Sequence, residues 1–287
     1  MLPEIFFGSI TIPTFFIVIS FSLSLLTLYL SRRVDLFSKN RQQAFDLALI
    51  LMTAGFVGGR LFHIFYEEWS FYKKYPWQMF YFWQGGFVFF GGFITAVAAT
   101  LIYCRWRKIS FLNWADFFAP LLSLGHAFGR IGCFLSGCCY GQYCDLPFSI
   151  NGRHPTTLYL FIGEVFIYFY LLFYERKIIR LQDKENSNLS ELKEINKESF
   201  YTGAVFMKWL LLHSLLRFYT EYFRDDFRGI FISVGPLGHW SVSQLICFIL
   251  ILTALLYFIS KSAVCLRFCS RQKTDHLADS HKIPNLR

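Results

Sequence analysis

Long apolar runs separated by short charged segments are the main feature of this chain. A helix that crosses the hydrocarbon core of a membrane needs about 20 apolar residues in succession. Seven stretches approach or exceed this length, and we expect a membrane span in each: residues 5–31, 47–66, 75–104, 117–134, 156–174, 199–222 and part of 229–260. The pattern predicts an all-α polytopic membrane protein with about seven transmembrane helices.

Basic residues alternate between the connecting segments and predict the orientation of the chain. Every second connection is rich in Lys and Arg, namely residues 31–41, 105–108, 175–198 and 261–287. Fewer basic residues occur in the connections of the opposite set, residues 67–80, 130–156 and 217–239. Because Lys and Arg accumulate on the cytoplasmic side of a membrane, we expect the N-terminus outside and the C-terminus in the cytoplasm.

The composition excludes a soluble enzyme and a nucleic-acid-binding protein. Hydrophobic residues make up 55% of the 287 residues, and charged residues only 16%. Soluble domains carry about 25% charged residues, and a soluble fold could not hide 36 phenylalanines. The net charge of +9 comes from basic residues in short groups between apolar runs, whereas nucleic-acid binding needs a continuous basic face.

We expect one transmembrane domain over residues 1–262 and a short cytoplasmic tail. The first apolar run has no basic residue before it and no cleavage site after it, so we interpret it as a retained span and not as a signal peptide. The polar composition of residues 263–287 predicts a disordered tail. Three segments are expected at the outer face: residues 67–80, 135–156 and 223–238.

Arginines near the outer ends of two predicted spans are the first candidates for a functional site. Charged groups inside a membrane are costly and usually have a partner or a task. Arg130 and Arg217 lie near the outer ends of the fourth and sixth spans. Arg217, Glu221 and Arg224 follow an i, i+4, i+7 spacing, which on a helix lets the carboxylate hold both guanidiniums. The arginines either form a cradle for a lipid phosphate or extend to the interface on flexible side chains.

Two glycine-rich runs lie at the same outer level. Residues 129–141 contain four glycines, a composition that disfavours a helix and lets the backbone approach a ligand closely. Residues 85–92 begin the third span and include Gly91 and Gly92. Close helix packing through small residues is the alternative for both runs. Arg60, in the second span, either braces a neighbouring helix or helps to form the site.

Histidine and cysteine side chains offer further candidates near the outer face. His154, at the start of the fifth span, is either a base or a hydrogen-bonding scaffold residue. Four cysteines lie at or above the outer face: Cys133, Cys138, Cys139 and Cys144. A disulfide from Cys138 or Cys139 to Cys144 and a set of free thiols are both open alternatives. The cysteine spacing fits no common zinc pattern, so we expect no metal site.

Six stretches of the chain, in the same order, resemble motifs of the bacterial prolipoprotein diacylglyceryl transferases. They are the GRIGCFLSGCCYG run of residues 129–141, the RHPT of 153–156 with the following Leu158-Tyr159, the Arg217-Phe218 pair with Glu221 and Arg224, the WQGG of 83–86 with Gly91-Gly92, the GRL of 59–61 and the SVSQ of 241–244.

The chain has one variant of the family signature and departs from the family pattern at three positions. In the signature, Cys133 and Cys138 stand where another form of the motif has Asn and Glu. Phe90 stands where relatives have histidine or tyrosine. Thr157 and Leu160 replace a Gln and a Glu. The resemblance therefore leaves the general base of the reaction unidentified.

The resemblance implies transfer of the diacylglyceryl group from phosphatidylglycerol to the lipobox cysteine thiol of a preprolipoprotein. A thioether forms and glycerol 1-phosphate is released. The enzyme is expected in the bacterial cytoplasmic (inner) membrane, as a multi-pass protein whose active site faces the outer leaflet and the periplasm. We expect it to act as a monomer, with no metal or organic cofactor and no nucleic-acid partner.

The resemblance also implies roles for individual residues. Arg130 is expected to bind the lipid phosphate, and Arg217 to stabilise the leaving group or the thiolate. Glu221 and Arg224 are expected to position Arg217. The other residues expected at the substrate are Arg60, Gly91, Gly92, Gly132, Gly141, His154 and Tyr159.

Two other functions fit the same residues. One is a membrane transporter or thiol redox carrier, in which the cysteines relay electrons and the arginines line a path. The other is a member of the same family that transfers a lipid to a different acceptor. Arginines that converge at one end of the protein would favour a transferase, since the polar groups of a transporter line a route through the bilayer.

Overall fold

The computed structural model of the chain describes residues 4–7, 10–188, 202–225, 231–233 and 239–280. Its long helices are α1 Thr14–Leu36, α2 Arg41–Phe62, α4 Phe89–Trp106, α5 Phe111–Ser136, α6 Thr156–Asn188, α7 Ala204–Glu221 and α8 Val242–Ser280. The shorter elements are the helix α3 Trp69–Lys74, a π-helical turn His63–Glu67, two 3-10 segments Pro76–Phe80 and Phe82–Gln84, and the strands β1 Glu4–Phe7, β2 Ile10–Pro13, β3 Phe231–Ser233 and β4 His239–Ser241. The strands form two antiparallel hairpins, β1–β2 and β3–β4.

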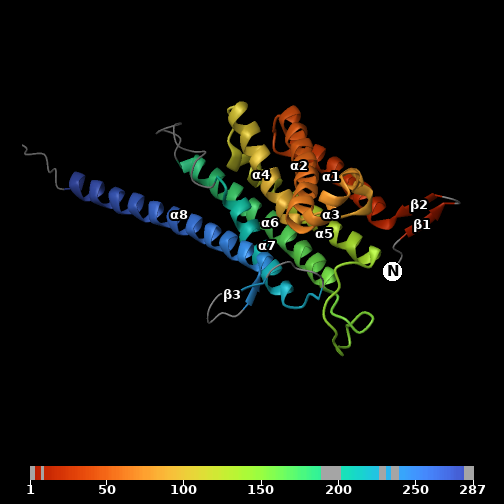
Figure 1. The fold of residues 1–287 in the computed structure, drawn as a ribbon. Coiled ribbons are helices and arrows are strands. Elements are labelled where there is room, and N and C mark those ends of the chain that lie inside the picture. The colour runs from red at the N-terminus through yellow and green to blue at the C-terminus, as the bar shows by residue number, and fades with distance from the viewer. Residues whose placement is uncertain (1–3, 8–9, 189–201, 226–230, 234–238, 281–287) are drawn as a thin grey trace, which may run out of the picture.

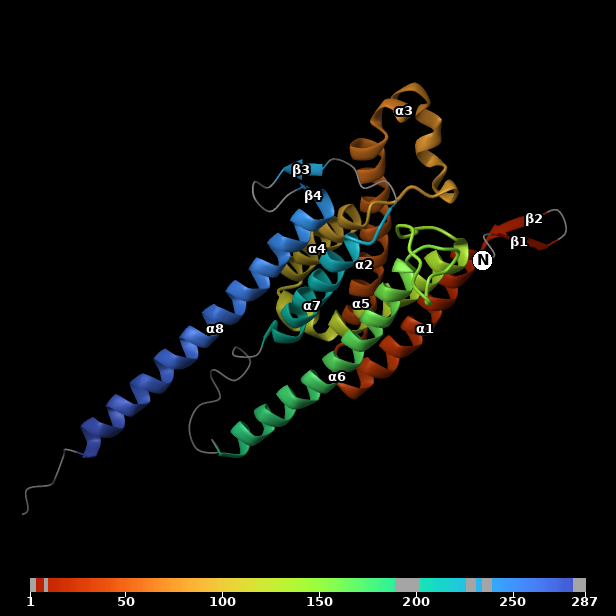
Figure 2. The same cartoon turned by 90° about the horizontal axis from the view of Figure 1, so that it is seen from below.

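The long helices form one bundle, and α5 is its central member (Figure 1). α5 packs against α1, α4, α6 and α7, while α2 packs against α4, and α7 against α8. In both ribbon views the C-terminal part of α8 extends beyond the other helices, and the β1–β2 hairpin projects on the opposite side (Figures 1 and 2). Side chains on α5 can therefore meet those of several neighbouring helices.

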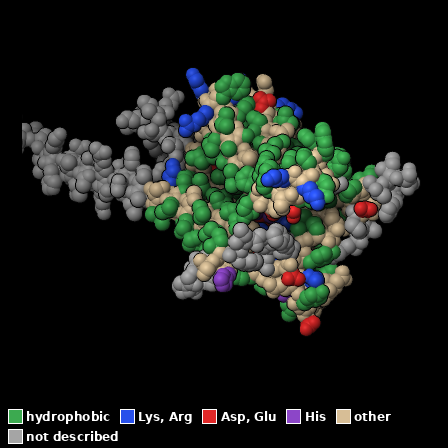
Figure 3. Space-filling view, viewed as in Figure 1, with side chains coloured by type: hydrophobic (Ala, Val, Ile, Leu, Met, Phe, Trp, Pro, Cys, Tyr) green, Lys and Arg blue, Asp and Glu red, His purple; other side chains and the backbone are tan. Residues whose placement is uncertain are grey.

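Apolar side chains cover the outside of this bundle. Within the described ranges, six helices are long and apolar enough to cross a membrane, namely α1, α2 with the π-helical turn, α4, α5, α6 and α8. Figure 3 shows hydrophobic side chains over most of the visible face, with Lys and Arg in small groups. The prediction of an all-α polytopic membrane protein is confirmed. α7 packs among these helices but carries three charged side chains, Lys208, Arg217 and Glu221.

Two helices begin later than the apolar pattern predicts. The β1–β2 hairpin replaces the start of the first predicted span, and α1 follows directly after Pro13. In the third predicted span, residues 75–88 form 3-10 segments and a loop, and α4 begins only at Phe89. Gly85 and Gly86 adopt φ values of 88° and 77° in this loop, which a helix does not allow. Apolar composition predicts which stretches suit a membrane but not the backbone conformation that they adopt.

The last helix is longer than predicted. α8 continues through residues 263–280, where the polar composition predicts a disordered tail. No Gly or Pro occurs from residue 242 to residue 280 to stop a helix that has already formed. Residues 281–287, and most of the polar connector at 181–198, lie outside the described residues.

Buried polar contacts hold together the end of the bundle where α4 ends and α5 begins. Arg33 of α1 is 3% exposed, forms an ion pair with Glu175 of α6 and donates from Nε to the carbonyl of Phe117 at 3.0 Å. Asp116 of α5 accepts two backbone N–H groups at the start of α7, at 2.6 and 2.8 Å, and so caps that helix. These contacts set the relative positions of α1, α5, α6 and α7.

Glycines allow α2 and α4 to pack closely. A Cβ at Gly91 would lie 2.4 Å from the side chain of Phe62, and a Cβ at Gly92 would lie 2.7 Å from the carbonyl oxygen of Gly55. Close helix packing, one of the two alternatives left open by the sequence, therefore accounts for both glycines. Their expected contact with the substrate stays a prediction.

Candidate active site

Three arginines converge at the end of the bundle where α5 and α7 end and α6 begins, which we call the site end. Arg130 lies in the last two turns of α5, and Arg217 lies near the end of α7. Arg217 is buried, and the positive charges of Arg224 and Arg130 act on it. The fold thus brings together the three arginines that the sequence singles out.

Glu221, at the end of α7, is fully buried and connects α7 to α8. Its carboxylate forms an ion pair with Arg217 and accepts a hydrogen bond from the Ser241 hydroxyl at 2.9 Å. The Ser241 hydroxyl also accepts the N–H of Gln244 at 3.2 Å, while the Gln244 side chain accepts the N–H of Ser241 at 3.0 Å. This reciprocal capping box begins α8. The SVSQ stretch therefore contributes a direct partner of Glu221.

Arg224 lies beyond the end of α7 and not on its helical face. The helix ends at Glu221, and the chain then turns so that Arg224 forms a β-bridge with Gly141. The predicted helical i+7 position is therefore wrong, because the helix stops before it reaches this residue. Arg224 approaches Arg217 through the turn that follows the helix.

Gly141 lies where three segments of the chain meet at the site end. A Cβ there would lie 2.4 Å from the carbonyl oxygen of His154 and 2.8 Å from that of Phe223, so only glycine fits. His154 Nδ1 lies 3.1 Å from the Tyr159 hydroxyl, and the His154 backbone N–H donates to the Gln142 carbonyl at 2.9 Å. These contacts favour the scaffold alternative for His154.

α5 continues through the glycine-rich run and ends only at Gly137. The helix includes Gly129 and Gly132, and Gly137 closes it with a φ of 72°. The expected irregular backbone is therefore confined to residues 137–141, because packing against other helices outweighs the low helix propensity of glycine. A Cβ at Gly132 would lie 3.1 Å from the ring of Phe15 in α1, which indicates close packing there.

Arg60 braces the loop that precedes α4. Its guanidinium donates to several backbone carbonyls of this loop, including that of Gln78 at 3.0 Å and that of Gly86 at 3.3 Å. A Cβ at Gly86 would lie 2.8 Å from Arg60 Nη1 and 2.3 Å from His63 Nε2. Bracing, one of the two roles left open by the sequence, describes these contacts, and binding of substrate by Arg60 stays a prediction.

Three residues that the sequence analysis did not assign to the site form a cluster next to the arginines: the partly buried His126 and the buried Glu164 and His213. His126 Nε2 accepts hydrogen bonds from the guanidinium of Arg130 at 3.0 and 3.2 Å. His126 Nδ1 lies 3.2 Å from Glu164 Oε1, and His213 Nδ1 lies 2.5 Å from the same oxygen. The second oxygen of Glu164 accepts the Ser123 hydroxyl at 2.7 Å.

A repeated spacing explains why this His–Glu–His cluster lies next to the arginines. His126 and Arg130 are four residues apart on α5, and His213 and Arg217 are four residues apart on α7. Each histidine therefore lies one turn from an arginine on the same helix face. This H-x-x-x-R spacing is the sequence signal that could have identified the cluster. The ring of Phe89 packs against both histidines, with centroids 5.4 and 5.8 Å apart.

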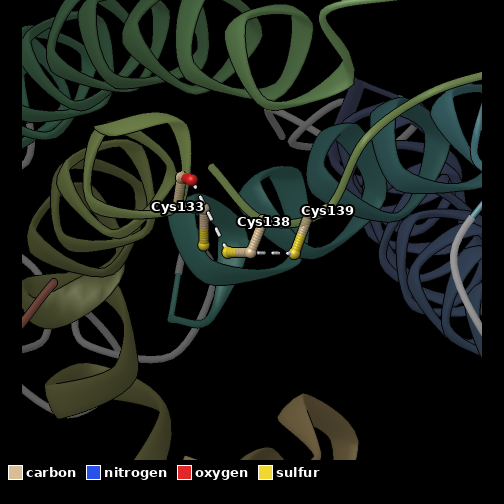
Figure 4. Close-up of side chains that lie close together, drawn as sticks. All are labelled: Cys133, Cys138 and Cys139. Carbon is tan, nitrogen blue, oxygen red and sulfur yellow. Dashed lines mark hydrogen bonds between the residues drawn. The ribbon is translucent and has the colours of Figure 1, made fainter. Parts of the chain in front are cut away.

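Three cysteine side chains gather at the end of α5 (Figure 4). The Sγ atoms of Cys133, Cys138 and Cys139 all lie within 4.8 Å of one another, and Cys139 Sγ is 3.7 Å from Cys138 Sγ. The cysteines whose side chains the structure describes (Cys104, Cys133, Cys138, Cys139, Cys144 and Cys247) are free thiols, and Cys144 lies outside this group. Hydrogen bonding with the other two thiols, together with the charges of two arginines, lowers the pKa of the Cys139 thiol against the opposing effect of burial.

Sequence comparison finds relatives over most of the chain. Residues 3–260 match the protein family described as prolipoprotein diacylglyceryl transferase. The phosphatidylglycerol–prolipoprotein diacylglyceryl transferase of Clostridium tetani is 26% identical over 201 residues, which cover 66% of this chain and 72% of that protein. The phosphatidylglycerol–prolipoprotein diacylglyceryl transferase 2 of Clostridium perfringens is 30% identical over 234 residues, which cover 77% and 80%. The Paracidovorax citrulli protein with the same name as the first is 31% identical over 213 residues, which cover 70% and 71%.

Proposed function

The chain belongs to the prolipoprotein diacylglyceryl transferase family, and we propose that it transfers the diacylglyceryl group of phosphatidylglycerol to the lipobox cysteine of a preprolipoprotein. The cysteine sulfur attacks the glycerol carbon that carries the phosphate. A carbon–sulfur bond forms, the carbon–oxygen bond breaks, and glycerol 1-phosphate leaves with the bonding electrons. The observation that best supports this proposal is the convergence of Arg130, Arg217 and Arg224 at the site end.

The three guanidiniums suit the anion that this reaction releases. Arg130 binds the lipid phosphate. Two of its five N–H donors contact His126, and among the described residues the others have no hydrogen-bond partner and can point toward a ligand. Arg217, held by Glu221, stabilises the leaving oxygen or the attacking thiolate. Arg224 adds a third positive charge nearby. Charged donors that are fixed in a site shielded from water stabilise developing negative charge strongly.

The His–Glu–His cluster helps to hold Arg130 and Arg217 in place. Glu164 is fully buried and lies beside histidines that are one turn from Arg130 and Arg217. Its carboxylate offsets part of the repulsion between the two guanidiniums. His126 links this carboxylate to Arg130 and so limits the directions in which that guanidinium can point. We assign the cluster a positioning role.

The same geometry favours a transferase over a transporter or redox carrier. The ionisable residues of the site lie together at one end of the bundle. At the opposite end, Arg33, Glu175 and the backbone of Phe117 are engaged with one another. A transporter would instead need polar groups along a route between the two ends.

In the cell, the site end faces the outer leaflet of the bacterial cytoplasmic (inner) membrane. There it meets phosphatidylglycerol and the lipobox segment of a preprolipoprotein from the side of the bilayer. The support is the alternation of basic residues along the sequence and the apolar surface of the helices.

A transfer assay with purified protein tests the proposal. The protein is placed in vesicles that contain phosphatidylglycerol and is given a synthetic lipobox peptide. The peptide mass is expected to rise by one diacylglyceryl group, with one glycerol phosphate released per peptide. Arg130→Ala is expected to reduce transfer by about a hundredfold or more. Arg41→Ala removes an exposed arginine at the opposite end and is expected to keep full activity.

Two results would contradict parts of the proposal. A normal transfer rate in folded Arg130→Ala would remove this arginine from the phosphate site. Equal transfer to a peptide whose cysteine lies outside a lipobox would indicate a family member with another acceptor. Complementation of a transferase-depleted bacterial strain, scored by lipoprotein maturation, checks the acceptor in cells.

A further inference from the structure

The reaction as proposed leaves three thiols at the end of α5 without a role. Cys133 comes from the last turn of α5, and Cys138 and Cys139 come from the turn directly after it. Figure 4 shows the three side chains together, with the Cys138 sulfur near the Cys133 carbonyl at 3.5 Å and beside the Cys139 sulfur. Three sulfur donors at this separation form a typical site for a thiophilic metal ion.

The sulfur positions match those of thiolates around one zinc ion. Zinc–sulfur bonds are about 2.3 Å long, so two thiolates in a tetrahedral site lie about 3.8 Å apart. The Sγ atoms of Cys138 and Cys139 are 3.7 Å apart, and that of Cys133 lies within 4.8 Å of both. A movement of about 1 Å or less in one sulfur completes three ligands of such a site.

The backbone of the turn is held in a conformation that gathers these thiols. Cys139 has a φ of 60°, in the left-handed region that residues with a side chain rarely adopt. Strain of this kind persists only where the surroundings enforce it, and it is concentrated at functional sites. Thr156 Oγ1 donates to the Cys139 carbonyl at 2.8 Å and thereby ties the turn to the start of α6.

The surroundings also suit a bound metal that a ligand can reach. Cys138 is exposed, and a small hollow lined by Cys138, Cys139 and Thr156 opens beside the thiols. A ligand that enters this hollow can therefore reach the sulfur atoms of Cys138 and Cys139.

We propose that Cys133, Cys138 and Cys139 bind one Zn²⁺ ion through three thiolates, and that the fourth coordination position receives the thiolate of the acceptor cysteine. The second part rests on the proposed transferase function. Three protein ligands and one open position are the arrangement of catalytic zinc sites. Coordination of the acceptor thiol releases its proton to solvent and activates the sulfur as a nucleophile. The sulfur then forms the bond to the glycerol carbon while glycerol phosphate leaves toward the arginines.

This site would supply a deprotonation step that the third-span motif of this chain lacks, since Phe90 cannot accept a proton. It would also be specific to this variant of the family motif, in which Cys133 and Cys138 replace Asn and Glu.

Zinc binding by the purified protein tests the site without any need for transfer. The full-length protein in detergent is reduced, stripped with a chelator and titrated with Zn²⁺ alone, and the bound metal per chain is measured after gel filtration. Native protein and Cys144→Ser, a control that removes a thiol outside the cluster, are each expected to retain one zinc ion. Cys138→Ser and the Cys138→Ser/Cys139→Ser double variant are expected to lose it. Absence of zinc from native protein, or equal retention by the double variant, would overturn the site.

X-ray absorption at the zinc edge tests the fourth position. A lipobox peptide is expected to raise the number of sulfur ligands from three to four, whereas the same peptide with serine in place of cysteine leaves three. An unchanged sulfur number would overturn the role of the acceptor thiolate.

The transfer assay separates this proposal from the proposed function. If the zinc-free protein transfers lipid at the full rate, the transferase function stands and the proposed role of zinc is wrong. If the zinc-loaded protein binds the peptide thiol but transfers no lipid to it, the metal site stands and the transferase function is wrong.

Discussion

The contacts of Glu221 decide how Arg217 can act. One carboxylate oxygen of Glu221 pairs with Arg217, and the other accepts the Ser241 hydroxyl, so both oxygens are already engaged. A carboxylate in this situation is suited to orient a guanidinium and poorly placed to take a proton from a substrate thiol. Its loss would leave a buried guanidinium without its charge partner, which costs far more than the loss of an exposed ion pair.

Glu221→Gln is expected to reduce transfer by about tenfold to a hundredfold. The amide keeps the shape and the contact with Ser241 but loses the charge that holds Arg217. Glu221→Ala is expected to be worse, since it removes both contacts. The pH–rate profile of Glu221→Gln should keep the shape of the native profile. Disappearance of its acidic limb would instead identify Glu221 as the base.

His126→Ala is expected to lower transfer by about tenfold or more, mainly through a higher KM for phosphatidylglycerol. The reason is that, among the described residues, His126 is the only member of the His–Glu–His cluster that contacts Arg130. His126→Gln, whose amide oxygen can accept from Arg130, should restore part of the loss. Replacement of the exposed His239 by alanine is the matched control. Equal KM values in native protein and folded His126→Ala would argue against the positioning role.

The packing of α4 against α2 depends on glycines, which have no side chain to keep the two helices apart. Gly92 and Gly55 bring the backbones of α4 and α2 into contact, and Arg60 holds the loop that leads into α4. This unit places Phe89 against the two histidines of the site. A change at the α2–α4 contact therefore affects the site through the position of α4, although no residue of that contact belongs to the arginine cluster.

Gly92→Ala is expected to destabilise the protein by about 1–3 kcal/mol, because the new Cβ would lie 2.7 Å from the carbonyl oxygen of Gly55. Gly129→Ala is the matched control in α5, where no atom lies within 4 Å of the added Cβ. The control is expected to keep the native Tm or to raise it slightly, since alanine favours a helix. Thermal unfolding in detergent, followed by loss of the monodisperse gel-filtration peak, measures both. Similar Tm values for the two variants would show that α2 and α4 can separate at no cost.

The bundle as a whole has two chemically different ends. One end carries the arginines, the thiols and the loop at residues 137–155, and the other carries the Arg33–Glu175 contact and the basic connections. The positive-inside rule places the basic end in the cytoplasm. This orientation and the expected monomeric state stay predictions.

Alkaline phosphatase fusions test the orientation, because this enzyme is active only outside the cytoplasm. A fusion after Gly152, in the loop at the site end, is expected to be active. A fusion after Lys108, between α4 and α5, is expected to be inactive and serves as the paired control. The reverse pattern would place the site in the cytoplasm, where the lipobox cysteine of a translocated preprolipoprotein could not reach it.

The sequence alone determines the membrane class, the approximate spans and the identity of the three arginines. The reason is that the bilayer imposes its requirement locally: every stretch that crosses it must be apolar for about 20 residues, and a charged residue within such a stretch stands out. The Arg217–Glu221 pair also follows from local spacing, because four residues make about one turn of a helix.

Only the tertiary structure decides which residues from different helices meet. Glu164 of α6 joins His126 of α5 and His213 of α7 although 38 residues or more separate them along the chain. Arg224 reaches Gly141 through a turn after α7, which helical spacing does not predict. The linear spacing of the cysteines predicts no metal site. The left-handed turn after α5 brings three of them close together. These contacts depend on helix rotation and on turn geometry, which are set by packing and by backbone sterics and not by hydrophobicity along the chain.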